Sequence, residues 1–559
     1  MRTIALVALM CLTACGSRRG SNGSGTPADP YPPMPVWDPA LYPMPMAGNN
    51  VRRTSQSPFN GPASVSSVWT YSAPGAYVLN IQAVVTANGL YFAGWGLPRR
   101  NSPATPDTWD KSDGRFYGVS LAGTDLWPSF HPLVPAGYLD PTRPMVSRDN
   151  YWLPGTGYHV TYYNGTIEGS PCVDPVNGRL YFGRGDGKLH AIDPITGTVA
   201  WSFATFNPFD AGEDTGGEII GGPVVGPGGT IYFATAGLPH PGSASDPAYE
   251  TNALYAVNSA GGLVWRYPAE TARLDNFVVC PPALSPDGRT LYVGTFAGDA
   301  TVPGKLLAID LAQPATATDA QRLKWSVTLK NTLRAAQPSI WVRHIAVGSD
   351  GRIYVGGGEA QFGGTSTIVT AFNPDGSFAW NPIYVEPQGY PAPSHWVGGF
   401  AIRETGTPVL YVSTTHMREW NQTGGQLIAM SPATGAILGT FDPSTLATPA
   451  VGSLTGPSIG ANGTIYVGVR GLHPTSTSAA VNGRMVALTF NGSTFTPLWD
   501  YAVDGQLDWV TPSIGADGGL YFGSSDDRLN GSMIKNFLDP WFDMTEIPPD
   551  TIPKFYGIK

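Results

Sequence analysis

A short hydrophobic motif recurs along the chain between clusters of turn residues. Each copy starts with a glycine turn and continues with an apolar residue, a tyrosine, an aromatic residue or valine, and a small residue, as in NGRLYFG and GRTLYVG. The repeated tyrosines are Tyr91, Tyr181, Tyr232, Tyr292, Tyr354, Tyr411, Tyr466 and Tyr521. Most stand about 50 to 60 residues apart, with one gap of about 90. A period of this length predicts a repeat architecture.

Each repeat is predicted to form four antiparallel strands, most clearly between residues 169 and 203. The runs GSPCVDP, RLYFGR, KLHAID and TVAWSF are separated by short turns that contain Gly178 and Gly197. Glycine suits such turns because it accepts a positive φ. The third run recurs in every unit, ending with SMIKNF at 532–537. Four antiparallel strands per unit predict the blades of a β-propeller, whereas a solenoid would need capping ends and a more regular period.

The two ends of the repeat array complement each other. The eighth unit has no fourth run, while SVWTYS at 67–72 precedes the first unit and resembles VAWSFA of the second. We therefore predict an all-β fold, a single eight-bladed β-propeller at 63–537 whose N-terminal strand closes the last blade. Residues 538–559 are predicted to be a C-terminal tail. Closure of this kind leaves no unpaired strand at the join.

Composition agrees with this architecture and excludes some functions. The chain has 70 glycines and 53 prolines, 42% apolar residues and only 13% charged residues, which suits strands and turns better than long amphipathic helices. A net charge of −9 argues against a nucleic-acid partner, since nucleic-acid binding needs a basic surface. Four cysteines in 559 residues do not form a disulfide framework.

The N-terminus has the features of an export signal. A basic residue, Arg2, precedes an apolar run at 3–12 that is too short to span a bilayer. The run ends in LTACG at 12–16, which resembles a bacterial lipobox, so residues 1–15 are predicted to be a lipoprotein signal peptide with Cys15 as the lipid-attachment site. The alternative is an ordinary signal peptide in which Cys15 is incidental.

Residues 16–62 are predicted to be a flexible tether because they are rich in Gly, Ser and Pro and show no periodicity. No aspartate follows Cys15, and by resemblance to sorted lipoproteins this indicates the outer membrane. The pattern leaves open whether the body faces the periplasm or the cell surface.

One repeat carries a recognisable family signature. The sequence from Ala191 to Trp201 fits the pattern A-x-D-x-x-T-G-x-x-x-W and is similar to the tryptophan-docking repeat of pyrroloquinoline quinone-like propellers. Partial copies extend over about 67–537. The resemblance implies that the indoles pack between neighbouring blades. The residues expected in this structural role are Trp69, Trp127, Trp201, Trp265, Trp325, Trp380 and Trp499.

Long insertions are predicted to gather on one face of the ring. They lie between second and third strands or between blades, at 94–114, 130–165, 238–252, 414–425 and 471–482, whereas 310–323 departs from this rule. Inserted loops on a rigid scaffold commonly carry binding residues, although aromatic side chains also serve to pack such loops. The candidate binding face comprises Trp95, Trp109, Trp152, Glu168, Glu218, Asn276, Arg343, His344, Trp396, Trp420, Asp508 and Trp509.

An enzymatic function is one reading of the family resemblance. Quinoprotein dehydrogenases imply pyrroloquinoline quinone over the channel, a calcium ion and an aspartate base. Glu168 or Glu218 with Asn276 could supply calcium ligands, but no local motif joins them. The chain has neither an adjacent cysteine pair nor a C-x-x-C-H haem motif. Cys172 and Cys280 are expected to be small buried residues without a bridge between them.

The preferred reading is a binding protein. The lipobox, the tether and the eight blades resemble the propeller lipoprotein of the outer-membrane β-barrel assembly machine. We therefore expect a lipid-anchored, monomeric, non-enzymatic scaffold without cofactor, metal or catalytic residues, whose loop-rich face binds a protein partner. The alternatives are a dehydrogenase that depends on pyrroloquinoline quinone and calcium, and a surface lipoprotein that binds glycans. Fold alone does not decide among these functions.

Overall fold

The structure is a computed structural model. It describes residues 31–73, 76–79, 81–96, 99–100, 109–110, 115–127, 150–152, 159–161, 169–185, 187–205, 219–236, 252–269, 274, 278, 280–295, 304–329, 340–359, 367–385, 395–416, 425–447, 452–471, 481–507, 510–525 and 553–559. The chain divides into two compact units, Met1–Pro32 and Pro33–Lys559. The second unit contains every described strand and is considered by itself below.

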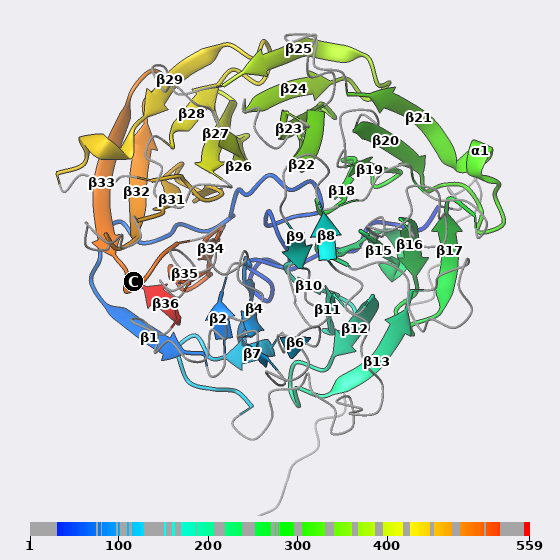
Figure 1. Cartoon of the computed structure of the whole chain (residues 1–559), viewed down its shortest axis with the longest axis horizontal. Helices are drawn as coiled ribbons and strands as arrows, with labels where there is room; N and C mark the ends of the chain where they lie inside the picture. The colour runs from blue at the N-terminus through cyan, green and yellow to red at the C-terminus, as the bar shows by residue number, and fades with distance from the viewer. Residues whose placement is uncertain are drawn as a thin grey trace, which may run out of the picture. The chain divides into compact units, whose positions relative to one another are not determined.

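Eight four-stranded antiparallel sheets surround a common axis in this unit (Figure 1). The predicted fold, an all-β eight-bladed propeller, is confirmed. From the inner to the outer strand, blade two comprises β10 (Cys172–Val173), β11 (Leu180–Gly183), β12 (Lys188–Ile192) and β13 (Val199–Ala204). Blade three comprises β14 (Val224–Val225), β15 (Ile231–Ala234), β16 (Leu254–Val257) and β17 (Leu263–Tyr267). Blade four comprises β18 (Ala283–Leu284), β19 (Thr290–Gly294), β20 (Lys305–Asp310) and β21 (Leu323–Thr328).

The next three blades follow the same order. Blade five comprises β22 (Ile340–Val347), β23 (Ile353–Glu359), β24 (Ile368–Phe372) and β25 (Phe378–Tyr384). Blade six comprises β26 (His395–Arg403), β27 (Val409–His416), β28 (Leu427–Met430) and β29 (Ile437–Phe441). Blade seven comprises β30 (Ser458–Ile459), β31 (Ile465–Val469), β32 (Arg484–Phe490) and β33 (Phe495–Ala502). The described helices are short: α1 (Asp319–Arg322), η1 (Pro227–Gly229) and η3 (Pro443–Thr445).

Blade eight is assembled from both ends of the chain. Its order is β34 (Ser513–Ile514), β35 (Leu520–Gly523), β36 (Lys554–Ile558) and β1 (Val68–Ser72), which confirms closure by the N-terminal strand. Two predictions are wrong here: residues 532–537 are not the third strand of blade eight, and residues 538–559 are not all a tail outside the ring. The third position is occupied by β36. Residues 532–537 lie outside the described part of the chain. The propeller therefore extends to Lys559, whose backbone carbonyl accepts bonds from the amides of Ser66 and Ser67 at 2.7 and 2.9 Å.

Blade one is the least regular. Its inner strand is divided into β2 (Ala76–Val78) and β3 (Val84–Thr86), which pair with successive parts of β4 (Gly89–Gly96), and β7 (Arg115–Val119) lies on the other side of β4. Where a fourth strand is predicted, the structure has a turn with one bridge between Val119 and Asp125. Two further hairpins, β5 (Arg99–Arg100) with β6 (Trp109–Asp110) and β8 (Asn150–Trp152) with β9 (His159–Thr161), stand apart from the blades.

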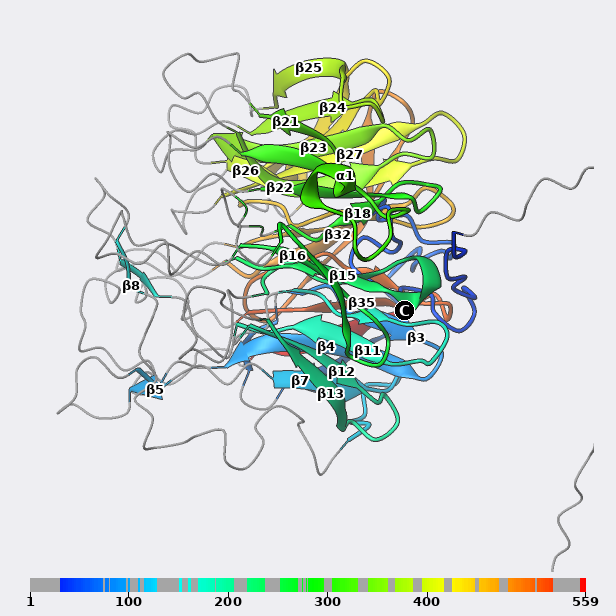
Figure 2. The same cartoon turned by 90° about the vertical axis from the view of Figure 1, so that its right-hand side faces the viewer.

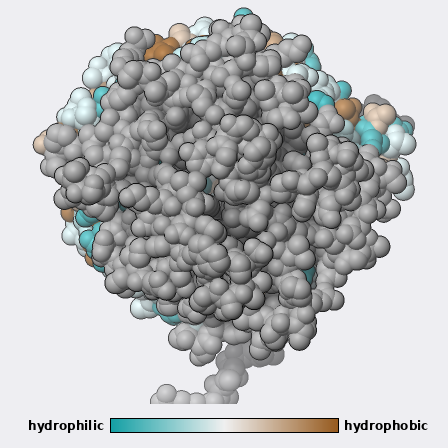
Figure 3. All heavy atoms as spheres, in the orientation of Figure 1, coloured by the Kyte–Doolittle hydropathy of each residue, from teal (hydrophilic) through white to brown (hydrophobic). Residues whose placement is uncertain are grey.

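Burial explains why the repeated motif forms the second strand of each blade. Every residue of β11, β15, β19, β31 and β35 is buried, since these strands are covered by blades on both sides. Outer strands instead alternate, as in β13, where exposed and half-buried positions follow one another. Consistent with this, the described residues visible around the rim in Figure 3 mix hydrophilic and hydrophobic types.

The predicted tether at 16–62 is wrong over its second half. Residues 33–62, hereafter the strap, belong to the compact unit, and Met44 and Met46 are fully buried in it. Figure 2 shows the strap (dark blue) on one side of the ring, with the β5 and β8 labels on the other. Absence of periodicity misled the prediction, because the strap is ordered by contacts with the ring rather than by helical or strand packing of its own.

Candidate functional site

The strap pairs with the inner strands of six blades. Backbone amides near the ends of these strands donate to strap carbonyls: Val85 to Met44, Val173 to Pro45, Leu284 to Val51, Val347 to Arg52, Ile402 to Thr54 and Ile459 to Ser55, at 2.8 to 2.9 Å. An inner strand has one edge that faces the axis, where its amides need a partner. The strap supplies these acceptors in the order of the blades and so lies along the inner edges of the blades.

Arg53 of the strap is 6% exposed. Its guanidinium donates three hydrogen bonds to backbone carbonyls: Nη1 to Ala47 at 2.6 Å, Nε to Pro282 at 3.1 Å and Nη2 to Pro223 at 3.3 Å. Burial lowers the pKa of Arg53 to about 10, so the group stays charged at neutral pH. The residue thus joins the strap to blades three and four at the axis.

Cys172 and Cys280 are close enough to Arg53 to interact with it electrostatically. Both are buried free thiols, and Cys280 donates to the carbonyl of Gly294 at 3.5 Å. Burial raises the pKa of both thiols, to about 11 for Cys280, despite the opposing charge of Arg53. At neutral pH both thiols are therefore protonated, and this environment does not favour reactive thiolates.

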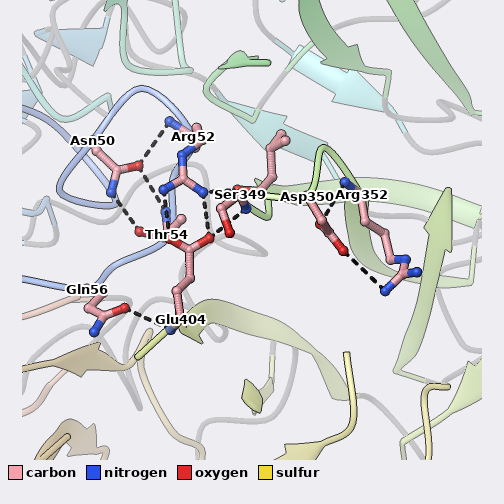
Figure 4. A network of polar contacts seen from close by, with 9 residues as sticks. Asn50, Arg52, Thr54, Gln56, Ser349, Asp350, Arg352 and Glu404 are labelled. Carbon is pink, nitrogen blue, oxygen red and sulfur yellow. Dashed lines mark hydrogen bonds and ion pairs between the residues drawn. The ribbon is translucent and has the colours of Figure 1, made fainter. Parts of the chain in front are cut away.

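A polar network fixes the strap to blades five and six (Figure 4). Arg52 donates from Nη1 and Nη2 to the two carboxylate oxygens of Glu404, at 2.6 and 2.7 Å. The same carboxylate accepts the amide of Ser349 at 2.6 Å, and Gln56 Oε1 accepts the amide of Glu404 at 2.9 Å. Partial burial would raise the pKa of Glu404, but the hydrogen bonds and charge of Arg52, with the Ser349 amide, lower it overall.

The tryptophans of the outer strands, and Trp127 after the turn of blade one, lie between blades. Trp201 packs on Gly261, a residue with φ of 87° in the next blade, and donates from Nε1 to the carbonyl of Ser259 at 3.1 Å. A side chain at Gly261 would collide with the indole, which lies 2.9 Å from an ideal Cβ position. The same bond to a turn of the following blade is made by Trp127 with Pro194, Trp325 with Pro374 and Trp380 with Pro432.

Three positions vary this arrangement. Trp499 donates to Pro62 of the strap at 3.0 Å, because blade eight has no continuous turn between its third and fourth strands. Trp265 is covered by the Arg322 guanidinium, 4.3 Å from the ring centroid. Trp69 packs on Gly123 and Gly557.

In blade six, Gly439 takes the place of tryptophan. A side chain there would lie 2.4 Å from the carbonyl oxygen of Ser493 in blade seven. Tyr411 of the same blade packs instead against Phe490 and Phe495, with ring centroids 6.0 and 6.1 Å away. Aromatic side chains of blade seven thus fill the space that an indole occupies at the other junctions.

Of the predicted binding face, Arg343 and His344 lie side by side in β22, at a bulge in the inner strand of blade five. His344 packs edge-on against Phe400 at 6.3 Å, and its Nε2 is buried without a hydrogen-bond partner. Burial, followed by the charge of Arg343, lowers the pKa of His344 to about 3 although a bond with the backbone of Val397 opposes the shift. The imidazole is therefore neutral across the physiological range.

The structure places the backbone of four more candidates: Trp95 in β4, Trp109 in β6, Trp152 in β8 and Trp396 in β26. The remaining candidates, and Cys15, lie outside the described residues: Glu168, Glu218, Asn276, Trp420, Asp508 and Trp509. The sequence interpretation missed the strap. The sequence signal for the strap was the presence of Met44, Met46 and two adjacent arginines in an otherwise Gly- and Pro-rich stretch.

The immediate surroundings of Arg53 do not favour calcium. A calcium ion takes carboxylate, amide and carbonyl oxygens, whereas the titratable side chains that interact with the Arg53 guanidinium are the thiols of Cys172 and Cys280. Within the described residues, no group of three or more His, Cys, Asp or Glu side chains could hold a metal ion. Within the same residues, no helix has the length and hydropathy of a membrane span.

A ring of eight four-stranded blades, with indoles packed on the turns of neighbouring blades, defines the chain as a quinoprotein-type β-propeller. A family model described as "Outer membrane protein assembly factor BamB" matches residues 112–530. The chain belongs to this family. No curated protein sequence matches the chain.

Solved structures of similar shape include proteins of two kinds. The quinohemoprotein alcohol dehydrogenase of Comamonas testosteroni is 14% identical, with a TM-score of 0.52 over 92% of this chain and 80% of that chain. Quinohemoprotein alcohol dehydrogenase ADHIIG of Pseudomonas putida HK5 is 13% identical, with a TM-score of 0.56 over 93% of this chain and 80% of that chain. BamB of Moraxella catarrhalis is 12% identical, with a TM-score of 0.46 over 89% of this chain and 100% of that chain. At these identities the two dehydrogenases show the shared fold alone.

Proposed function

We propose that this protein is a lipid-anchored, non-enzymatic propeller that acts as a protein-binding scaffold in the assembly of outer-membrane proteins. Membership of the assembly-factor family over residues 112–530 is the observation that carries the proposal. The strap supports it, because Arg53 and the strap carbonyls occupy the inner edges of the blades on one side of the ring with the protein's own chain. Recognition then falls to the opposite face, which carries the β5–β6 and β8–β9 hairpins, and Cys15 holds the protein at the outer membrane.

Deletion of the gene from its host tests this function. The amount of folded β-barrel protein in the outer membrane should fall, as measured by heat-modifiable mobility on gels. The wild-type gene should restore it. The Cys15→Ser variant should restore less and should lose labelling by radioactive palmitate. Unchanged levels of folded barrels after deletion would refute the assembly role, and equal palmitate labelling of both proteins would refute the anchor.

The second candidate is a dehydrogenase that uses pyrroloquinoline quinone and calcium. The observation that favours it is the likeness of the ring to two quinohemoprotein alcohol dehydrogenases over more than nine tenths of the chain. The full chain would be titrated with pyrroloquinoline quinone and calcium while calorimetric heat and dye-linked oxidation of alcohols and sugars are followed. Saturable binding with turnover would show that the protein is a dehydrogenase and would overturn the scaffold function. Binding without turnover would not overturn it.

A further inference from the structure

The most exposed large apolar side chains of the described residues lie near one another on the strap side of the ring. Val36, Ile195 and Val176 are 85%, 84% and 81% exposed, more than any other large apolar side chain of the described residues, and Leu41 is 50% exposed, as is Ile437 in the outer strand β29. We name these four residues the blade-two patch. Val176 and Ile195 occupy the two turns of blade two that open on the strap side, between β10 and β11 and between β12 and β13. The other exposed large apolar residues belong almost entirely to outer strands.

A single hydrophobic cluster lies beneath the patch. Trp37, which follows Val36, donates from Nε1 to the carbonyl of Val173 at 3.0 Å and so places the start of the strap beside blade two. Trp37 and Tyr42 pack with Val173 and Trp127 in this cluster. An ideal Cβ on Gly178, in the turn that carries Val176, would lie 4.0 Å from the Tyr42 hydroxyl. These contacts fix the segments of backbone that carry the exposed side chains.

The chain enters the compact unit on this same side. The carbonyl of Pro33 accepts the amide of Gly228 at 3.3 Å, and Met34 packs on Gly288, each in a turn on the strap side of the ring. Only 17 residues, 16–32, separate Cys15 from Pro33. Even fully extended, a segment of that length reaches about 60 Å. A lipid anchor on Cys15 would keep the strap side at a local concentration of a few mM, about that expected for short linkers.

We propose that the blade-two patch contacts the lipid surface of the membrane that holds the anchor. This inference rests on the proposed anchor at Cys15. Weak apolar contacts suffice at the local concentration that a short tether imposes, since docking is then intramolecular. Asp38 and the net charge of −9 favour zwitterionic over anionic lipid. With the strap side on the membrane, the opposite face, which carries the β5–β6 and β8–β9 hairpins, points away from it and is free for a partner.

The test replaces lipidation by an artificial tether, so that it does not depend on Cys15. A histidine tag substitutes for residues 1–15, which precede the compact unit, and binds phosphatidylcholine vesicles that contain nickel-chelating lipid. An environment-sensitive NBD label is attached to Val176→Cys. The matched control is Phe378→Cys, 44% exposed in an outer strand of blade five. The native Cys172 and Cys280 do not compete for label, because they are buried.

On vesicles, the label at position 176 should brighten by at least about twofold, shift to the blue and be quenched by spin-labelled lipid, because it enters the apolar interface. The label at position 378 should keep its emission in water. The signal at position 176 should survive 0.5 M salt, which screens charge but not apolar contact. Equal, water-like emission at both positions on tethered protein would overturn the proposal. Equal palmitate labelling of the wild-type and Cys15→Ser proteins, together with a positive result here, would refute only the native anchor.

A second variant guards against an effect of the label itself. With the label moved to Leu41→Cys, the double substitution Val176→Asp and Ile195→Asp should abolish the change in emission. Leu498→Asp, at a position 46% exposed on the outer strand of blade seven, should leave the change intact. All three aspartates replace exposed side chains, so the ring should remain folded. An unaltered signal in the double variant would also overturn the proposal.

Discussion

Replacing Met46 by Ala separates a structural strap from a flexible tether. Met46 is fully buried and forms a β-bridge with Cys172, in the part of the strap that pairs with the inner strands. A buried Met→Ala change costs about 2 to 5 kcal/mol, through lost burial and a residual cavity. If the strap detaches as a unit, the equilibrium between attached and detached forms shifts by about 30-fold to a few thousandfold, at 1.4 kcal/mol per factor of ten.

The assay is amide hydrogen exchange followed by mass spectrometry. The amides of Val173, Leu284 and Val347 donate to strap carbonyls, so their exchange reports strap opening. The control is Leu41→Ala, which removes a side chain that is 50% exposed in the same strap and should change exchange by less than about threefold. Equal exchange in wild-type and Met46→Ala proteins would show that residues 33–62 add nothing to the ring and would refute the reasoning.

Three further predictions concern other contacts of the ring. Arg52 lowers the pKa of Glu404 below 4.5, so the stability that ionised Glu404 contributes should be present above pH 4.5 and lost as the pH falls below it. The urea midpoint of Glu404→Gln should lack this acid-dependent loss. Identical pH profiles of wild-type and Glu404→Gln proteins would contradict the prediction. The pKa of His344 is lowered to about 3, so as the pH falls below 6.5 this side chain gains a proton only in the unfolded state. Wild-type stability should therefore decline below pH 6.5, and His344→Gln should lack this part of the decline. Trp201→Ala should cost about 3 kcal/mol in urea unfolding, and Trp201→Phe, which keeps packing on Gly261, clearly less; a loss well under 1 kcal/mol for Ala would contradict the docking geometry.

The repeat and the closure of the ring could be predicted because their signals are local. The residues of β11 and its equivalents are buried on both faces, so each copy needs the same short apolar run with a tyrosine, as at Tyr181. The closing strand β1 carries the same alternation as β13, since both lie at the outer edge of a blade. A signal for β36 was also present, because KFYGI at 554–558 resembles RFYGV of β7, which holds the third position in blade one.

The candidate site was predicted less well. Arg343 and His344 were chosen because they stand near the mouth of an inner strand, and the structure places them in β22 at a bulge. The half-buried position of His344 could not be read from the sequence, since it depends on Phe400 in the next blade. Likewise, Glu404 gave no local sign of an ion pair, because its partner Arg52 is 352 positions away along the chain.

By itself the sequence determined the β-propeller, the number of blades and the closure by an N-terminal strand. These follow from short-range patterns, namely the period-two burial of strands and the glycine turns between them. Only the tertiary structure decided the fate of residues 33–62. Their carbonyls become acceptors only when six inner strands converge on one axis and present amides there. A segment without periodicity of its own can be ordered by such a ring, because the partners of its backbone groups come from blades far apart in the chain.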